Sequence, residues 1–388
     1  MIVLILMSAV LGTGVQTTGA QTEPRPKGAV ADSGTRSLRS RLSLQVAQFG
    51  TLAAQADAAR EKGAADAPLL YQRALKLKPD WKDGWWALGM IHYGKSQYAE
   101  STPAFEKLVA LDRTAAPAYA MLGLSEYNLT RYDAAVDNLA KAQKLNVMNE
   151  SIGQASMYTL AKLWTKKGNF EGALGILYEF AQLGKESPAF LLLSGTAGLW
   201  KAMFPEEVPE ADRDLVFLAG KAFWESARRN VPVARASFDD LLVRYPATAG
   251  VHYLYGSFEM YDNVDRALTL FEEELRITPD HIGAQMALGA EYVRRGEPAK
   301  ALPFARKSVE LAPQSYASHT LLGRALVDTG ELAPALKELE TARQMAPEDP
   351  QPRIALASLY AKLGRKEDAA RERREFLRIQ AANKKPNE

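Results

Sequence analysis

The sequence predicts an all-α solenoid, in which one kind of helix pair is stacked repeatedly along the chain. The first observation is a fixed interval. Prolines that end apolar–basic stretches recur every 34 residues, at Pro279, Pro313 and Pro347. Alanines recur at the same interval, at Ala267, Ala301, Ala335 and Ala369. A period of this length is typical of stacked repeats, so we expect the 388 residues to form one array rather than separate globular cores.

The second observation is the helical spacing of apolar residues within one period. Leu288 and Tyr292 share one face of a first helix, and Ala301 and Ala305 share one face of a second. Gly296 separates the two segments, as expected of a glycine that ends a helix and permits a tight turn. Neither helix can bury its apolar face alone, so each pair depends on its neighbours for a core.

The N-terminal residues predict an exported protein. Residues 2–11 form an apolar run, and the small and polar residues that follow are typical of a secretory signal peptide cleaved between Ala20 and Gln21. No lysine or arginine precedes the run. An uncleaved membrane anchor is the competing interpretation, although the run is shorter than the roughly 18–20 apolar residues that span a bilayer. We therefore expect a signal peptide over residues 1–20 and a periplasmic or secreted location.

Four further parts are expected after the signal peptide. They are a disordered linker, N-terminal repeats, an irregular repeat region with an insertion, and C-terminal repeats with a capping helix, over residues 21–40, 41–187, 188–247 and 248–388. In the irregular region, a helix is expected over 188–204, followed by an excursion at 204–214. The last helix interleaves Arg and Lys with Glu and is expected to be a solvated cap, with a basic docking tail as the alternative.

Composition excludes several classes of function. The chain has 48 Lys and Arg against 46 Asp and Glu, and this balance argues against nucleic acid or a polybasic membrane contact as the main partner. There is no cysteine, which rules out disulfides, zinc–thiolate sites and cysteine nucleophiles. Four histidines leave few choices for a metal site, and no metal or cofactor is expected. Of these, His92 and His319 are expected to be packed within repeats and His281 to be exposed.

One stretch of the sequence matches a phosphate-binding motif. Residues 89–96 read G-x-x-x-x-G-K-S, a pattern that works when glycines let backbone N–H groups wrap phosphates between a strand and a helix. Here the preceding residues belong to the first helix of a repeat, and Gly89 is expected at a helix–helix contact. We therefore expect no phosphate site, and replacing Lys95 should leave function intact.

The repeats resemble the tetratricopeptide repeat family. One copy of its pattern reads Leu288-Gly289, Tyr292, Ala301 and Pro313. Copies begin at residues 48, 82, 116 and near 154, and again at 248, 282, 316 and 350, so the resemblance covers residues 48–383. It implies a right-handed superhelix of antiparallel helix pairs. It also implies a non-catalytic scaffold that holds a partner protein or peptide in a concave groove.

In this family the first helix of each repeat lines the groove, and the resemblance implies which positions face a partner. Carried over repeat by repeat, they are Trp86, Met90, Tyr93, Tyr127, Asn128, Tyr158, Lys162, Phe217, Trp224, His252, Met286, Arg294 and Arg324. The same rule selects Lys166. Aromatic residues, Met and Arg are enriched in protein interfaces, and we expect the first four aromatic residues of this set to be the anchors. The Asn and Lys pair that clamps a peptide's terminal carboxylate in some members is not reproduced.

Three other interpretations stay open. The groove side chains could pack against neighbouring repeats instead of a partner. Because aromatic faces also stack on sugar rings, a glycan- or peptidoglycan-binding module is the second candidate function. The least favoured is an enzyme with a site in residues 204–235, where four acidic residues cluster: Glu206, Glu207, Asp212 and Asp214. The preferred prediction is a protein-binding scaffold of the bacterial cell envelope.

Overall fold

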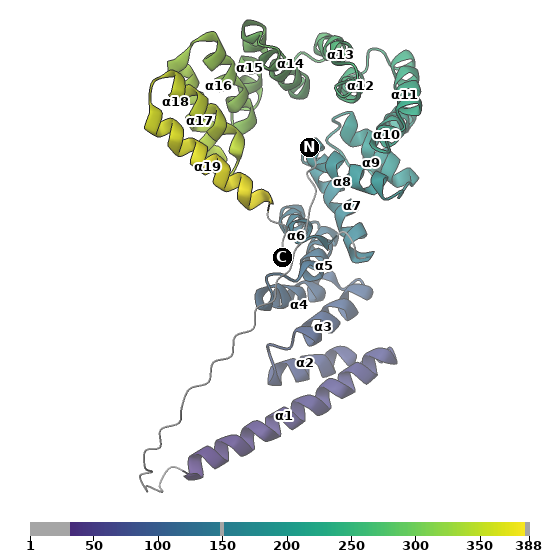
Figure 1. The fold of residues 1–388 in the computed structure, drawn as a ribbon. Helices are drawn as coiled ribbons and strands as arrows, with labels where there is room; N and C mark the ends of the chain where they lie inside the picture. The colour runs from purple at the N-terminus through teal and green to yellow at the C-terminus, as the bar shows by residue number, and fades with distance from the viewer. Residues whose placement is uncertain (1–31, 148–150, 385–388) are drawn as a thin grey trace. The chain divides into compact units, whose positions relative to one another are not determined.

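The computed structural model describes residues 32–147 and 151–384, so the predicted signal peptide lies outside the described residues. Within these two ranges the chain forms nineteen α-helices and no β-strand, which confirms the all-α prediction (Figure 1). None of the helices in this part of the chain is both long and apolar enough to cross a membrane.

The described chain divides into two compact units. The N-terminal unit comprises residues 32–147, 151–183 and 201–207, and the C-terminal unit comprises residues 184–200 and 208–384. Residues 201–207 thus belong to the N-terminal unit, although in sequence they lie between two helices of the C-terminal unit.

The helices of the N-terminal unit run from α1 to α8. Their bounds are α1 (Asp32–Glu61), α2 (Ala67–Leu77), α3 (Lys82–Gly94), α4 (Tyr98–Leu111), α5 (Ala116–Asn128), α6 (Tyr132–Lys144), α7 (Ser151–Lys166) and α8 (Phe170–Gln182). Residues 205–207 add a short 3-10 helix, η2 (Pro205–Glu207).

The helices of the C-terminal unit run from α9 to α19. Their bounds are α9 (Pro188–Gly198), α10 (Arg213–Ala227), α11 (Val231–Arg244), α12 (Val251–Glu259), α13 (Val264–Ile277), α14 (Ile282–Arg294), α15 (Pro298–Leu311), α16 (Tyr316–Thr329), α17 (Leu332–Met345), α18 (Pro350–Lys362) and α19 (Lys366–Lys384). A 3-10 turn, η3 (Glu210–Asp212), precedes α10.

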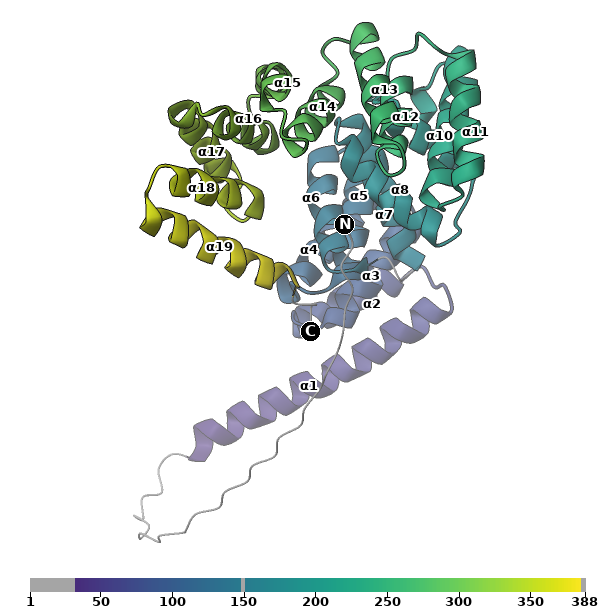
Figure 2. The same ribbon diagram turned by 45° about the horizontal axis from the view of Figure 1, so that its top comes forward.

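Consecutive helices form hairpins, and the spacing of the hairpins follows the sequence period. In Figures 1 and 2, α3 lies beside α4, α5 beside α6, α14 beside α15 and α16 beside α17. Helices α14, α16 and α18 begin at Ile282, Tyr316 and Pro350, at the predicted starts. Gly296 has a φ of 72° and ends the first helix of its hairpin, as expected. The fold is therefore a solenoid of antiparallel helix pairs.

Small residues let the two helices of a hairpin approach closely. Ala301 and Ala335 are fully buried at these contacts. At Gly89 of α3, a Cβ atom would lie 2.8 Å from the ring of Phe105 in α4. The stretch that matches the phosphate-binding motif therefore begins inside a packed helix and not in a loop.

The predicted disordered linker is wrong in its C-terminal part, where helix α1 begins. The linker was expected to extend to residue 40, but the chain is helical from Asp32 onward, and residues 21–31 lie outside the described residues. The helix is held through its C-terminal half, where Ala56 is buried against Tyr71 and Leu75 of α2. Once a turn has formed, each further residue adds one hydrogen bond, so a helix extends beyond the part that packs. Amino-acid composition alone does not predict this cooperative extension of the helix.

Helix α9 also ends earlier than expected. The predicted helix over 188–204 stops at Gly198, and Trp200 adopts a left-handed φ of 54°. Helices α9 and α10 cross at a glycine contact, because a Cβ atom at Gly195 would overlap the carbonyl oxygen of Val216, and one at Gly220 would overlap that of Leu191. The expected excursion is present as irregular chain with the turns η2 and η3.

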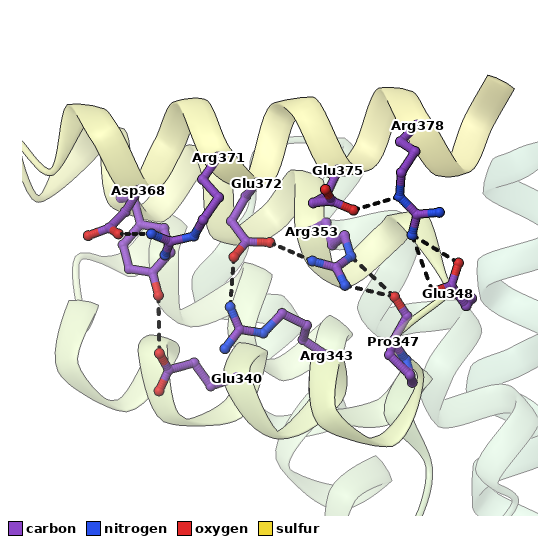
Figure 3. Close-up of polar contacts among 11 residues, drawn as sticks. Glu340, Arg343, Pro347, Glu348, Arg353, Asp368, Arg371, Glu372, Glu375 and Arg378 are labelled. Atoms are coloured by element: carbon purple, nitrogen blue, oxygen red, sulfur yellow. Dashed lines mark hydrogen bonds and ion pairs between the residues drawn. The ribbon is translucent and has the colours of Figure 1, made fainter. Parts of the chain in front are cut away.

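The last helix, α19, is pinned by a buried acid as well as by apolar contacts. Glu372 is only 2% exposed at its side chain, and its carboxylate accepts hydrogen bonds from Arg343 of α17 at 2.7 Å and Arg353 of α18 at 3.1 Å (Figure 3). Arg353 also donates to the carbonyl oxygen of Pro347. The prediction that α19 is a solvated cap is therefore wrong for its inner face. This face carries an ion-paired carboxylate that joins three helices.

Candidate functional site

Three of the predicted groove residues meet at one place in the N-terminal unit. Tyr127 lies in the last turn of α5, and Tyr158 and Lys162 lie four residues apart on α7, so these two share a helix face. The Lys162 amine donates a hydrogen bond to the Tyr127 hydroxyl at 3.0 Å. It also lies 5.4 Å from the centroid of the Tyr127 ring and 6.0 Å from that of Tyr158. Together with Lys166, one turn further along α7, we call these residues the lysine site.

A segment of the same chain is seated on the lysine site. Glu206 Oε1 lies 2.6 Å from Lys162 Nζ, and Glu207 Oε2 lies 2.7 Å from Lys166 Nζ. The side chain of Lys162 is 10% exposed, whereas those of Glu206 and Glu207 are 64% and 45% exposed. The lysine is therefore built into the fold, while the acids reach it from outside. We call residues 201–207 the docked segment.

Phe204 supplies the apolar part of the docked segment. Its ring meets Tyr132 edge-on at 5.6 Å and Tyr127 at 6.5 Å between centroids. The amines of Lys162 and Lys166 each lie 5.4 Å from the centroid of the Phe204 ring. One aromatic side chain is thus recognised by two aromatic rings and two cations.

The docked segment is shaped by a local turn. The N–H of Phe204 donates to Glu207 Oε2 at 2.8 Å, and Pro205, which is buried, begins η2 between them. Glu207 therefore bonds both its own backbone and Lys166. The turn places the aromatic ring and the two carboxylates toward the same site.

Charge at the site is set by these contacts. Burial lowers the pKa of the Lys162 amine, but its hydrogen bonds with Glu206 and Tyr127 outweigh that effect and leave the pKa above its usual value. The hydrogen bonds from Lys166 and from the Phe204 N–H lower the pKa of Glu207. Both shifts favour the charged form of the group, a cation at Lys162 and a carboxylate at Glu207.

Four further predicted residues of the N-terminal unit lie among the first helices of its repeats. Trp86 is half-buried, with its ring edge-on to Phe105 at 5.7 Å, and Met90 is half-buried one turn later. Tyr93 is also half-buried, and burial raises its pKa. Asn128 is exposed and donates to the carbonyl oxygen of Leu124 at 2.8 Å.

Four predicted residues of the C-terminal unit are wholly or partly accessible. Phe217 is exposed on α10. Arg294 is exposed and makes a bidentate contact with Glu291 at 2.5 and 2.6 Å. Arg324 lines a cavity of about 300 Å³ on α16 and α18. Met286 is half-buried against the apolar core of the following repeats. The structure does not bring these four together into one cluster comparable with the lysine site.

Two predicted groove residues are wrong. Trp224 is 1% exposed, because the close glycine contact of α9 and α10 turns its ring onto Phe190, where the two stack at 5.9 Å. His252 is 8% exposed, because Glu274 of α13 accepts the N–H groups of Gly250 and Tyr253 and holds this end of α12 against α13. Neither side chain is available to a partner.

His281 is also misplaced by the sequence prediction. It is buried rather than exposed, because it caps the N-terminus of α14 by accepting the N–H of Ala284, and its ring packs between Trp200 and Tyr253. His92 and His319 are half-buried or buried within their repeats, as expected.

Three of the four acidic residues of the excursion make ion pairs with different basic residues. Glu206 and Glu207 face lysines, and Asp214 pairs with Arg244 and accepts a hydrogen bond from Tyr245 at 2.7 Å. Within residues 32–147 and 151–384, no group of three or more His, Asp or Glu side chains is placed to hold a metal ion.

Comparison with known protein families finds repeats of one kind in two parts of the chain. Family models described as tetratricopeptide repeat match residues 116–146 and 320–383. These matches show tetratricopeptide repeats in both ranges, and the repeated helix hairpins agree with them. No curated protein matches the sequence.

Several solved structures are similar to part of the chain. A MamA double mutant is 19% identical and covers 44% of this chain and 98% of its own, with a TM-score of 0.39. YrrB, described as a TPR protein with an unusual peptide-binding site, is 21% identical and covers 44% of this chain and 91% of its own, with a TM-score of 0.39. MamA from Desulfovibrio magneticus RS-1 is 18% identical and covers 60% of this chain and 98% of its own, with a TM-score of 0.30.

Proposed function

We propose that this protein is a non-catalytic scaffold that binds a segment of a partner protein on the first helices of its N-terminal repeats. The observation that carries the proposal is the docked segment, because a stretch of polypeptide already lies on predicted groove residues. Tyr127 and Lys162 hold it through contacts with the Phe204 ring and through a hydrogen-bonded ion pair between Lys162 and Glu206. A surface that recognises its own chain in this way has the chemistry needed to recognise another.

The neighbouring first helices extend the proposed interface. Trp86, Met90 and Tyr93 on α3 are half-buried, so each has accessible area left for a partner. Partly exposed aromatic and Met side chains contribute strongly to protein interfaces because they bury a large area at a small cost in conformational entropy. Binding would be the sum of modest contacts along several repeats.

The setting of this function is proposed to be the bacterial cell envelope. The support is the sequence of residues 2–20, an apolar run followed by small residues. N-terminal sequencing of the protein recovered from a periplasmic or secreted fraction tests it. A first residue of Gln21 is expected, and recovery of the intact chain from the cytoplasm would contradict export.

Capture of a partner tests the binding function. Residues 21–388 would be used as bait against the envelope fraction of the source organism, beside a Trp86→Ala/Tyr93→Ala variant. Tyr127 is left intact because it also holds the docked segment. A Phe217→Ala/Arg324→Ala variant is the matched control on the C-terminal unit. Circular dichroism melts would confirm that all three baits are folded.

A partner retained by the parent and by the control, and lost by Trp86→Ala/Tyr93→Ala, is the expected result. Equal retention by all three baits would place the interface elsewhere. Retention of cell-wall glycan with no protein would instead favour the glycan-binding alternative, because aromatic faces also stack on sugars.

A further inference from the structure

The lysine site requires an acidic occupant. With the docked segment in place, Lys162 is largely withdrawn from water. Besides Glu206, its amine contacts the Tyr127 hydroxyl and lies within 6.0 Å of the ring centroids of Tyr127, Tyr158 and Phe204. An ammonium group that is buried without a counter-ion is costly, so the site favours a bound carboxylate. Lys166, which is more exposed, adds a second position for a negative charge one helical turn away.

The site also favours one order of aromatic and acidic side chains along a peptide. In the docked segment the aromatic ring comes first, and the two carboxylates follow two and three positions later, at Glu206 and Glu207. The ring of Phe204 lies against Tyr132 and beneath both amines, while each carboxylate takes one lysine. A peptide with the acids before the ring could not make both sets of contacts in this direction.

The docked segment is only partly embedded in the fold, since Pro205 is buried and Phe204 is half-buried while both glutamates are exposed. It is irregular chain with a single 3-10 turn, and both of its carboxylates are largely exposed. The Lys166–Glu207 ion pair, whose side chains are 38% and 45% exposed, contributes little to stability because water and salt screen it, whereas the pair at Lys162 is more sheltered. The receiving side chains, in contrast, lie on α5, α6 and α7, which pack against one another without the segment.

We propose that residues 201–207 are an internal competitor at the lysine site, which they vacate for a partner's segment carrying an aromatic residue followed two and three positions later by acidic residues. This inference rests on the proposed function and names the partner's chemistry. Because the competitor is tethered, its effective concentration is high, and the apparent affinity for a free peptide is reduced by the fraction of sites it fills.

A peptide titration tests the exchange. The probe is a fluorescein-labelled peptide with the sequence of residues 201–208, and its binding to the full chain is followed by fluorescence anisotropy. An open variant, Phe204→Ala/Glu206→Gln/Glu207→Gln, removes the competitor's contacts while leaving the lysine site intact. The altered side chains are half-buried or exposed, so the fold should be retained, and melting curves would check this.

The open variant should bind the peptide at least tenfold more tightly than the parent. Adding Lys166→Gln to the open variant should weaken binding at least fivefold. Adding Lys167→Gln is the matched control, because Lys167 is the next residue but pairs with Asp133 of α6 instead. A second peptide carrying the same three substitutions should fail to compete with the probe.

Equal peptide affinities for the parent and the open variant would overturn the proposal that residues 201–207 compete for the lysine site. Equal effects of Lys166→Gln and Lys167→Gln would overturn the assignment of the site. These failures are distinguishable from failure of the proposed function. If capture of a partner still depends on Trp86 and Tyr93, the scaffold function stands and only the inference fails.

Discussion

Lys162 shows how far the sequence determines the place of a candidate functional side chain. The repeat register predicted that Tyr127, Tyr158 and Lys162 would face the same surface, and the structure brings these three together. The occupant of that surface could not be predicted in the same way. The occupant is formed by Phe204, Glu206 and Glu207. These residues lie in the part of the chain that departs from the period, so no repeat position assigns them a partner. The available signal was charge complementarity between two acids and two lysines.

The pH dependence of peptide binding follows from Glu207. Its pKa is lowered when it is bound to Lys166, so the contact stabilises binding above the ordinary glutamate pKa of about 4.3 and is lost as the pH falls through the lowered value. Affinity of the labelled peptide for the open variant should therefore be constant near neutral pH and fall as the solution becomes acidic below about pH 4. A peptide with Gln at the position of Glu207 should show a smaller change, and identical profiles would contradict this assignment.

Burial separates a core residue from a predicted anchor. Leu288 is fully buried, and Leu288→Ala should lower the free energy of unfolding by about 2–5 kcal/mol. Trp86 is half-buried, so Trp86→Ala should cost less, about 1–2 kcal/mol, mainly through the lost contact with Phe105. Chemical denaturation of both variants measures the difference. A loss for Trp86→Ala as large as that for Leu288→Ala would assign Trp86 to the core.

At the scale of elements, the 34-residue period predicted helix starts well, because the same packing contacts recur in each hairpin. It failed where local contacts differ from the repeat. Helix α9 ends at Gly198, and Trp224 is buried, because two glycines let α9 and α10 approach more closely than an ordinary pair. Helix α1 begins before the predicted linker ends, because helix propagation is cooperative.

The glycine contact between α9 and α10 is testable by adding one methyl group. Gly220→Ala places a Cβ atom on the carbonyl oxygen of Leu191, which is backbone and cannot rotate away. The helices must separate, and we expect a loss of about 3 kcal/mol or more in the free energy of unfolding. Gly175→Ala, on an exposed and open position of α8, is the control. It should raise stability by about 0.5–1 kcal/mol because alanine favours the helix. Similar losses for both would contradict the close contact.

The ion pairs of α19 provide a second test at this scale. Glu372→Gln removes a buried charge that is shared by Arg343 and Arg353, both of which keep some exposure to water. We expect a loss of about 1–3 kcal/mol, below the value for a fully buried pair. Glu375→Gln, which removes an exposed partner of Arg378, should change stability by less than about 0.5 kcal/mol. Thermal melts in low and high salt measure both, and equal effects would show that Glu372 is not a structural link.

For the whole molecule, the regular repeats and the departure from them have different roles. The hairpins supply cores and place the first helices, which is what a solenoid does wherever its period holds. The excursion between α9 and α10 supplies the segment that lies on the lysine site. Function is often carried by such loops because they are free of the packing that fixes the repeats. The repeat fold could therefore be predicted from the period, whereas the candidate site required the structure.

The central claim is that the lysine site of the N-terminal unit binds a segment of a partner protein. The most direct measurement is quantitative capture from the envelope fraction with three baits: the open variant alone, with Lys166→Gln, and with Lys167→Gln. Using the open variant removes the docked segment, so that only contacts with the partner are compared. The account predicts equal retention by the open variant and Lys167→Gln, and retention at least about fivefold lower with Lys166→Gln, a difference of roughly 1 kcal/mol. A partner retained equally by all three baits would contradict it.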